Sequence, residues 1–232
     1  MNIEIWSDFA CPFCYIGKRH LEKALDQFPH KNHVTVEFKS FELDPHAEKF
    51  TEKTMAELLA GKYRIPVTQA ENMTANVASQ ANSVGLTYHF DSMQPTNMLD
   101  AHRLTQFAKT KGKANELAER LFYAYFTESK HLSTPETLVE LATEAGLDSM
   151  EAADVLASKR YTEEVKQEHQ HGVSLGLQGV PFFVIDRTYI ISGAQPPSVF
   201  LESLQKAWEE QHPSTSDQPS DDMNCSDGTC KS

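Results

Sequence analysis

The sequence lacks the features of a membrane protein and of a nucleic-acid-binding protein. Its 232 residues contain no apolar run near the roughly 18–20 residues that a membrane-spanning helix needs. Basic residues are the minority, 21 against 33 acidic ones, and the net charge of −12 disfavours nucleic acid as a partner. The N-terminal stretch MNIEIWSDFA has neither the basic flank nor the apolar core of a signal peptide, so we expect a cytoplasmic protein.

Cysteine is also scarce, with four residues in the chain. Four are too few to build a disulfide-stapled scaffold, and a reducing cytosol would not keep one oxidised. In that setting cysteines more often do chemistry or bind metal. Cys11 and Cys14 form a Cys-Pro-Phe-Cys motif, whereas Cys225 and Cys230 lie near the C-terminus.

The hydrophobic pattern around the motif predicts strands and helices in a definite order. Residues 3–6 predict a short strand, a helix follows from Pro12, and residues 34–38 alternate as a second strand does. These two strands are expected to be parallel. Residues 181–192 predict an antiparallel hairpin, and a last helix begins at Pro197. The order β-α-β, helical insertion, α-β-β-α is that of an α/β protein with a thioredoxin fold.

Four segments follow from this order. We expect a first thioredoxin-like half over 1–45, an inserted helical domain over 46–160, a second thioredoxin-like half over 161–211, and a flexible C-terminal tail over 212–232. Within the insertion, Ser133–Glu136 has the pattern of a capping box that opens a helix.

The position of the Cys-Pro-Phe-Cys motif predicts redox chemistry. Cys11 precedes the first helical turn, where unpaired N–H groups and the helix dipole stabilise a thiolate. Cys14, one turn inside, is expected to be more buried and less ionised. Cys11 is therefore the expected nucleophile toward a substrate disulfide, and Cys14 the thiol that resolves the mixed disulfide. A zinc site would need two more ligands, for which Cys225 and Cys230 have unsuitable spacing, so we expect no metal.

Three stretches together resemble the DsbA family of thiol–disulfide oxidoreductases, and within it the FrnE-like branch. They are SDFACPFCYIG (7–17), NMLDAHRL (97–104) and GVPFFV (179–184), and the resemblance extends over roughly residues 1–210. It implies exchange with protein thiols and disulfides or small thiols, through a redox-active disulfide and without a bound organic cofactor, with isomerase activity left open. It also implies a cis bond before Pro181, which presents the backbone of Val180 to the substrate.

Relatives with the same inserted architecture leave an alternative open. The 2-hydroxychromene-2-carboxylate isomerases and kappa-class glutathione transferases activate glutathione with a serine at the position of Cys11 and lack the pair. Both cysteines are present here, which favours redox exchange and leaves glutathione open as a co-substrate. Asn97 and His102 lie where those relatives shape a substrate pocket. We expect helix capping from Asn97 and a hydrogen-bonded helical histidine at residue 102.

The expected tail carries the second cysteine pair. An Asp-Gly pair between Cys225 and Cys230 favours a tight turn that brings the two sulfurs together. The linker after His212 is long enough to reach Cys11, so we hypothesise that the tail pair relays electrons. An unrelated exposed dithiol or an adventitious metal clip is the alternative. The sequence does not distinguish a monomer from a homodimer.

Overall fold

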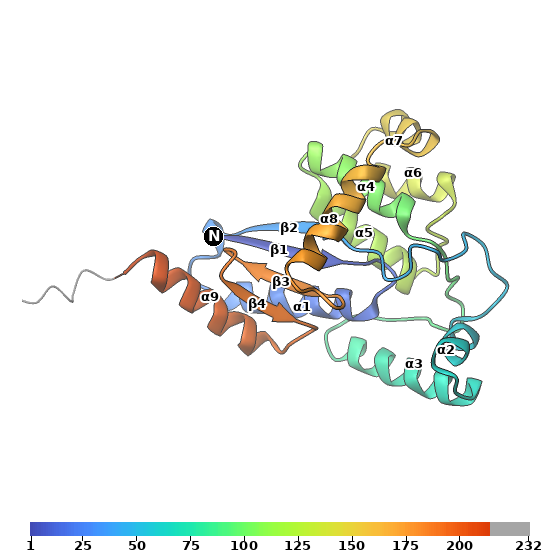
Figure 1. Ribbon diagram of the computed structural model, residues 1–232, viewed down its shortest axis with the longest axis horizontal. Helices are drawn as coiled ribbons and strands as arrows, with labels where there is room; N and C mark the ends of the chain where they lie inside the picture. The colour runs from blue at the N-terminus through green and yellow to red at the C-terminus, as the bar shows by residue number, and fades with distance from the viewer. Residues whose placement is uncertain (214–232) are drawn as a thin grey trace, which may run out of the picture.

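A four-stranded mixed sheet forms the centre of the fold in a computed structural model, which describes residues 1–213 (Figure 1). The strands lie in the order β2-β1-β3-β4. β1 and β2 are parallel and β3 and β4 are antiparallel, as the sequence predicts, and β3 is also antiparallel to β1. The strands are β1 (Asn2–Ser7), β2 (Thr35–Ser40), β3 (Phe182–Ile185) and β4 (Tyr189–Ser192).

Helices cover both faces of this sheet. α1 and α9 pack against each other on one face and α8 lies on the opposite face beside α4, whereas α2 and α3 of the insertion lie near α1 (Figure 1). The helices are α1 (Pro12–Gln27), α2 (Met55–Tyr63), α3 (Val67–Asn82), α4 (Leu99–Thr110), α5 (Ala114–Phe126), α6 (Pro135–Glu144), α7 (Ser149–Ala157), α8 (Thr162–Ser174) and α9 (Pro197–Gln211), with a short 3₁₀ helix at Lys31–His33. None of these helices is both long and apolar enough to cross a membrane.

The central strand β1 is buried on both faces because helices cover both sides of the sheet. Its side chains point alternately to the two faces, as they do in any strand. Ile3 and Ile5 belong to the large core that also contains side chains of α1 and α9. Trp6 points to the other face, where its indole N–H donates to the carbonyl oxygen of Glu168 in α8 at 2.8 Å. Gly172 of α8 lies directly against that indole. This close approach fixes α8 across the sheet.

The helices α2 to α7 lie between β2 and α8 in the chain, where the sequence predicts a helical insertion. Their side chains and those of the sheet form one continuous core, and the domain boundaries proposed above stay a prediction. The capping box expected at Ser133–Glu136 is wrong. Thr134 is the N-cap there, and its side chain makes no capping bond. The Ser133 hydroxyl, expected to cap the helix, donates instead to the carbonyl oxygen of Asn97. A true capping box, formed by Thr54 and Glu57, opens α2.

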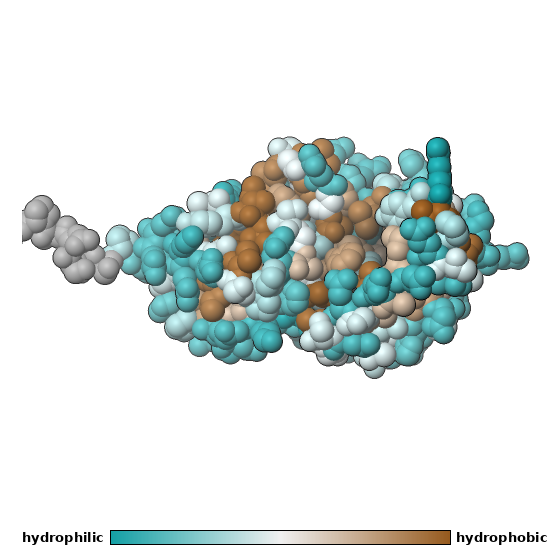
Figure 2. Space-filling model, turned by 90° about the horizontal axis from the view of Figure 1, so that it is seen from below, coloured by the Kyte–Doolittle hydropathy of each residue, from teal (hydrophilic) through white to brown (hydrophobic). Residues whose placement is uncertain are grey.

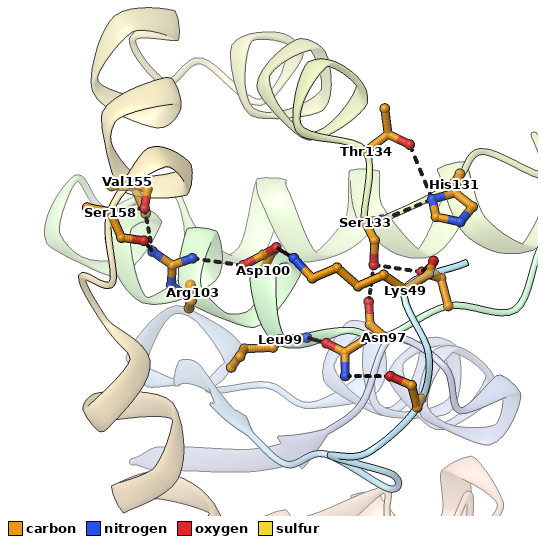
Figure 3. A network of polar contacts seen from close by, with 12 residues as sticks. Lys49, Asn97, Leu99, Asp100, Arg103, His131, Ser133, Thr134, Val155 and Ser158 are labelled. Carbon is orange, nitrogen blue, oxygen red and sulfur yellow. Dashed lines mark hydrogen bonds and ion pairs between the residues drawn. The ribbon is translucent and has the colours of Figure 1, made fainter. Parts of the chain in front are cut away.

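A buried polar network holds the segment before α2 against α4 (Figure 3). The Lys49 ammonium pairs with Asp100 at 2.7 Å, and the Arg103 guanidinium donates to the other oxygen of Asp100 at 2.8 Å. A buried guanidinium is tolerated only when its donors are satisfied. The remaining donors of Arg103 meet the carbonyl oxygens of Val155, Ser158 and Arg160. The network therefore ties this segment to the body of the insertion.

Candidate active site

The cysteine motif lies where β1 ends and α1 begins. Cys11 is the N-cap of α1, with φ −92° and ψ 111°, and Pro12 occupies the first helical turn. Proline fits there because the missing N–H would have no helical partner. Cys11 is 5% exposed and Cys14 is 2% exposed, and both are free thiols. The more accessible sulfur is thus the one at the helix N-terminus, where a thiolate is favoured.

The loop before β3 meets the cysteine motif from the other end of the chain. The Cys11 thiol donates to the carbonyl oxygen of Val180 at 3.4 Å, and the Val180–Pro181 peptide bond is cis, as expected. The structure therefore brings together Cys11, Cys14, Val180 and Pro181. The second predicted pair, Cys225 and Cys230, lies outside the described residues.

A glycine of α1 allows this close approach. A Cβ atom at Gly17 would lie 3.1 Å from the Pro181 ring and 3.1 Å from the Phe183 ring. Such contacts are tighter than ordinary packing, so a larger residue would push the loop away from α1. In the sequence this glycine is visible only as the last residue of the stretch SDFACPFCYIG. Its functional signal is its position one helical turn after Cys14, facing the proline loop.

The two thiols differ in how easily they ionise. Burial raises the pKa of Cys14 well above its ordinary value, and the neighbouring Cys11 raises it further through a hydrogen bond and its charge. A thiol with a raised pKa keeps its proton near neutrality. This supports the expected division of roles, because the buried thiol would act only after the first sulfur has reacted.

The loop that carries Cys11 is held by a buried carboxylate. The carboxylate of Asp8 accepts the N–H of Ala10 at 3.0 Å and the N–H of Leu43 at 2.6 Å. The latter bond joins this loop to the segment that follows β2. Asp8 is therefore a structural part of the site, although it belongs to no recognisable catalytic motif of the sequence.

The histidine of the NMLDAHRL stretch does not have the environment that we expected. His102 is buried against the ring of Phe9, and its Nε2 has no hydrogen-bond partner among the described residues. Its nearest charged neighbour is Asp8, at 3.5 Å. The expectation of a hydrogen-bonded histidine is therefore wrong, because the oxygens of Asp8 are already directed at backbone N–H groups. Asn97 is not the N-cap of α4 as expected, because Met98 occupies that position without a side-chain capping bond; the Asn97 side-chain oxygen instead accepts the N–H of Leu99, the first residue of the helix.

Two hollows lie on either side of Phe13. One, of about 400 Å³, is bordered by Val180 and Pro181. The other, of about 350 Å³, extends from Cys11 toward α2 and α3 and is called the α2–α3 cavity below. Seen from below, the molecule shows apolar side chains gathered around a hollow in the middle of its face (Figure 2). The α2–α3 cavity is lined mainly by apolar side chains, among them Met55, Leu58, Leu59, Met73, Val77, Phe90 and Met98.

The described part of the chain offers no metal site. Across residues 1–213, no three His, Cys, Asp or Glu side chains come together in a way that would hold an ion. Tetrahedral zinc sites in proteins take three or four such ligands. Within this range the cysteine pair therefore has no additional ligands for zinc.

Comparison with known proteins gives a family match over nearly the whole described chain. The model of the DSBA-like thioredoxin domain matches residues 2–205. A solved structure of a probable DsbA oxidoreductase from Streptomyces coelicolor is 41% identical, with a TM-score of 0.87 and 92% of each chain covered. The uncharacterized protein YwbO of Bacillus subtilis is 27% identical over 88% of this chain and 96% of its own length. The cytosolic disulfide reductase DsbM of Pseudomonas aeruginosa shares the fold, with a TM-score of 0.63 and 15% identity. Its superposition covers 90% of this chain and 100% of the DsbM chain.

Proposed function

Since the chain belongs to the family of DSBA-like thioredoxin domains, we propose that it is a dithiol–disulfide oxidoreductase acting on protein disulfides and thiols through Cys11 and Cys14. One observation carries the proposal: Cys11, the less buried cysteine of the pair, is the N-cap residue of α1, its sulfur lies 3.4 Å from the Val180 carbonyl oxygen, and it borders the α2–α3 cavity. A nucleophilic sulfur at such a position is reachable by an extended substrate chain.

The reaction proceeds by two exchanges of a sulfur–sulfur bond. The Cys11 thiolate attacks a substrate disulfide, a mixed disulfide forms, and one substrate sulfur leaves as a thiolate that takes up a proton. Cys14 then loses its proton and attacks the Cys11 sulfur, which releases the second substrate thiol. Two electrons pass to the substrate, and the protein retains a Cys11–Cys14 disulfide. The reverse sequence oxidises a substrate dithiol. In isomerisation, the released substrate thiolate attacks a different disulfide of the substrate, and another substrate thiolate then displaces Cys11.

Val180 is the proposed docking point for the substrate backbone. Its carbonyl oxygen accepts the Cys11 thiol in the free protein. A substrate chain that adds alongside the loop in a strand-like manner would pair with the Val180 backbone, while the Pro181 ring packs against α1 at Gly17. Main-chain pairing of this kind gives affinity with little dependence on sequence.

Reduction of insulin disulfides by dithiothreitol tests the proposal. We expect the intact protein to accelerate the reduction and Cys11→Ser to abolish the acceleration. Cys14→Ser is the matched control, because it keeps the attacking thiol and should accumulate mixed disulfides that mass spectrometry detects. Acceleration that survives in Cys11→Ser would contradict the assignment.

A glutathione-dependent transferase or isomerase is the second candidate. The α2–α3 cavity next to Cys11 favours it, because that volume is large enough for a small organic substrate. Such chemistry does not need the resolving thiol. Glutathione conjugation that persists at full rate in Cys14→Ser, without insulin reduction by the intact protein, would establish this function instead.

We include a cytoplasmic location and a tail relay in the proposal. The fold shared with a cytosolic disulfide reductase supports the location, which cell fractionation checks. For the relay, Cys225 and Cys230 would exchange with Cys11 and pass electrons to or from it. In Cys14→Ser protein, peptide mapping is expected to find a mixed disulfide between Cys11 and a tail cysteine. Its absence would remove the relay and leave the Cys11–Cys14 chemistry intact.

A further inference from the structure

We propose that the α2–α3 cavity selects the disulfide that Cys11 attacks, favouring one that carries an apolar group next to a cationic group, with Glu42 as the partner of the cation. The proposal rests on the function proposed above and adds the substrate class. Cys11 and Glu42 both line this cavity. A substrate sulfur placed at Cys11 would therefore direct its neighbouring groups toward Glu42.

Glu42 is a buried carboxylate without a partner. The residue is 9% exposed, and its carboxylate has neither a hydrogen bond nor an ion pair with any of residues 1–213. Buried acidic groups in proteins are almost always paired, since an uncompensated charge away from water is costly. A cationic group of a ligand would supply the missing partner.

The acid next to Glu42 has a different environment. Asp8 also lines the cavity, but its oxygens accept the N–H groups of Ala10 and Leu43. Its negative charge remains and adds to that of Glu42. Lys62 is the basic residue among those that line the cavity, and it is exposed at the rim, where water and salt screen its charge. His102, His46 and Lys166 also act on Glu42 from neighbouring elements, but none of them forms an ion pair with its carboxylate. The inner end of the cavity, where Asp8 and Glu42 lie, therefore has room for a cationic partner.

The apolar walls of the cavity determine which group should accompany the cation in the substrate. Side chains from α2 and α3 give an apolar surface between the rim and Cys11. An apolar group that leaves water against this surface gains affinity, and a charged group there would lose its hydration. A cysteine flanked by an aromatic and then a lysine matches both features. Glutathione carries a net negative charge and no apolar side chain, so we expect it to be the poorer partner.

Mixed-disulfide formation with designed peptides tests the selection. The protein is reduced Cys14→Ser, and the probes are symmetrical disulfides of acetyl-Cys-Phe-Lys-amide, acetyl-Cys-Phe-Gln-amide and acetyl-Cys-Phe-Glu-amide. In each reaction the Cys11 thiolate forms a new sulfur–sulfur bond, the peptide disulfide breaks, and one peptide thiol is released. Rates are read by acid quench and mass spectrometry. We expect the lysine peptide to react at least about tenfold faster than the glutamate peptide.

Variants assign this preference to the cavity. The net charge of −12 alone attracts cations, so each variant is compared with one that loses the same charge elsewhere. Glu42→Gln is expected to reduce the Lys-to-Glu rate ratio at least about fivefold, whereas Glu52→Gln, at an exposed residue that does not line the cavity, should leave it unchanged. Replacement of Phe by Gly in the lysine peptide should slow the reaction of the parent variant.

The outcomes separate the two proposals. Two results would overturn the selection and leave the redox function. In one, mixed disulfides form with all peptides at equal rates; in the other, Glu42→Gln and Glu52→Gln change the Lys-to-Glu rate ratio by the same factor. Failure of every peptide to react would overturn the redox function and the selection with it. If Glu42→Gln does not fold, the Lys-to-Glu rate ratio of the parent variant at high salt decides, because salt screens the net charge more than a contact inside the cavity. A ratio that persists at high salt supports the selection, and a ratio near one there overturns it.

Discussion

Nε2 of His102 lies 3.5 Å from Oδ1 of Asp8, and both side chains are 3% exposed. Asp8 comes at the end of β1 and His102 lies on α4, so this contact joins the loop of Cys11 to the helical insertion. The two N–H groups that Asp8 accepts hold that loop in place. The position of Cys11 therefore depends on a carboxylate that takes no part in sulfur exchange.

Asp8→Asn tests this dependence. An amide has one acceptor oxygen, so either the Ala10 or the Leu43 N–H would lose its partner, at a cost of about 1–3 kcal/mol in the free energy of unfolding. We also expect slower insulin reduction, because the loop of Cys11 shifts. Denaturant unfolding and the insulin assay measure the two effects. Asp91→Asn, at an exposed aspartate, is the control, and equal stability of the two variants would refute the argument.

The raised pKa of Cys14 predicts a pH dependence of the second exchange. In the mixed disulfide Cys11 carries neither a proton nor a charge, so burial, the largest cause of the raised pKa, is what keeps Cys14 protonated, and only the Cys14 thiolate resolves that disulfide. Below that pKa the thiolate fraction, and hence the resolution rate, rises about tenfold for each pH unit. Rapid-mixing kinetics of mixed-disulfide decay should show this rise between neutral and alkaline pH. A rate independent of pH over that range would mean that another group removes the proton.

The contact between Gly172 and Trp6 predicts the effect of a single methyl group. A Cβ atom at Gly172 would lie 2.7 Å from two atoms of the Trp6 indole, so Gly172→Ala must displace α8 or the ring. We expect a loss of about 1–3 kcal/mol in the free energy of unfolding. Gly61→Ala in α2 is the matched control, because nothing lies within 4 Å of its Cβ and alanine favours a helix. Thermal or denaturant unfolding should show opposite signs for the two variants.

Glu42 predicts a gain in stability when its charge is removed. Burial raises the pKa of its carboxyl, and the charge of Asp8 adds to this while that of His102 opposes it. In the unfolded chain the pKa of this carboxyl is 4.5, and in the folded protein it is higher. Below pH 4.5 the carboxyl is neutral in both states and does not destabilise the fold, but as the pH rises through the folded pKa the buried group ionises and the folded state loses stability. Other charged groups acting on Glu42 come from neighbouring elements, namely His46 and Lys166.

The Glu42→Gln variant should therefore be more stable than the parent near neutral pH, by about 0.5–2 kcal/mol. That gain corresponds to a rise of roughly 2–4 °C in Tm for each kcal/mol in a chain of this size. It should disappear below about pH 4, where both the parent and the variant are neutral at this position. Calorimetry at several pH values measures the difference. A variant less stable than the parent at pH 7 would show that Glu42 has a stabilising partner.

The order of strands and helices could be predicted because the sequence marks their ends clearly. Pro12 opens α1, and Gly85 follows α3 with a φ of +81° that glycine adopts readily. The error at Ser133 has a physical reason. Its hydroxyl has a tertiary partner, the carbonyl oxygen of Asn97, and local sequence does not reveal that competition.

The centre of the site was predictable, whereas its surroundings were not. Cys11, Cys14, Val180 and Pro181 lie within two short motifs, and the structure brings them together. Glu42 resembles an ordinary acid at the end of a strand. Its role depends on α2 and α3 enclosing the same cavity as Cys11, which is a matter of tertiary packing and has no local signal.

The pairing of Cys11 with Val180 also has a consequence for how the protein is made. The two residues are 169 positions apart, and β1 needs both β2 and the late strand β3 as neighbours in the sheet. At about 5–20 residues per second, a ribosome takes roughly 10–30 s between them. During that interval Cys11 and Cys14 have already been synthesised, but the loop of Val180 that later covers them has not. The nascent chain therefore exposes both thiols to the surrounding solution before the fold covers them.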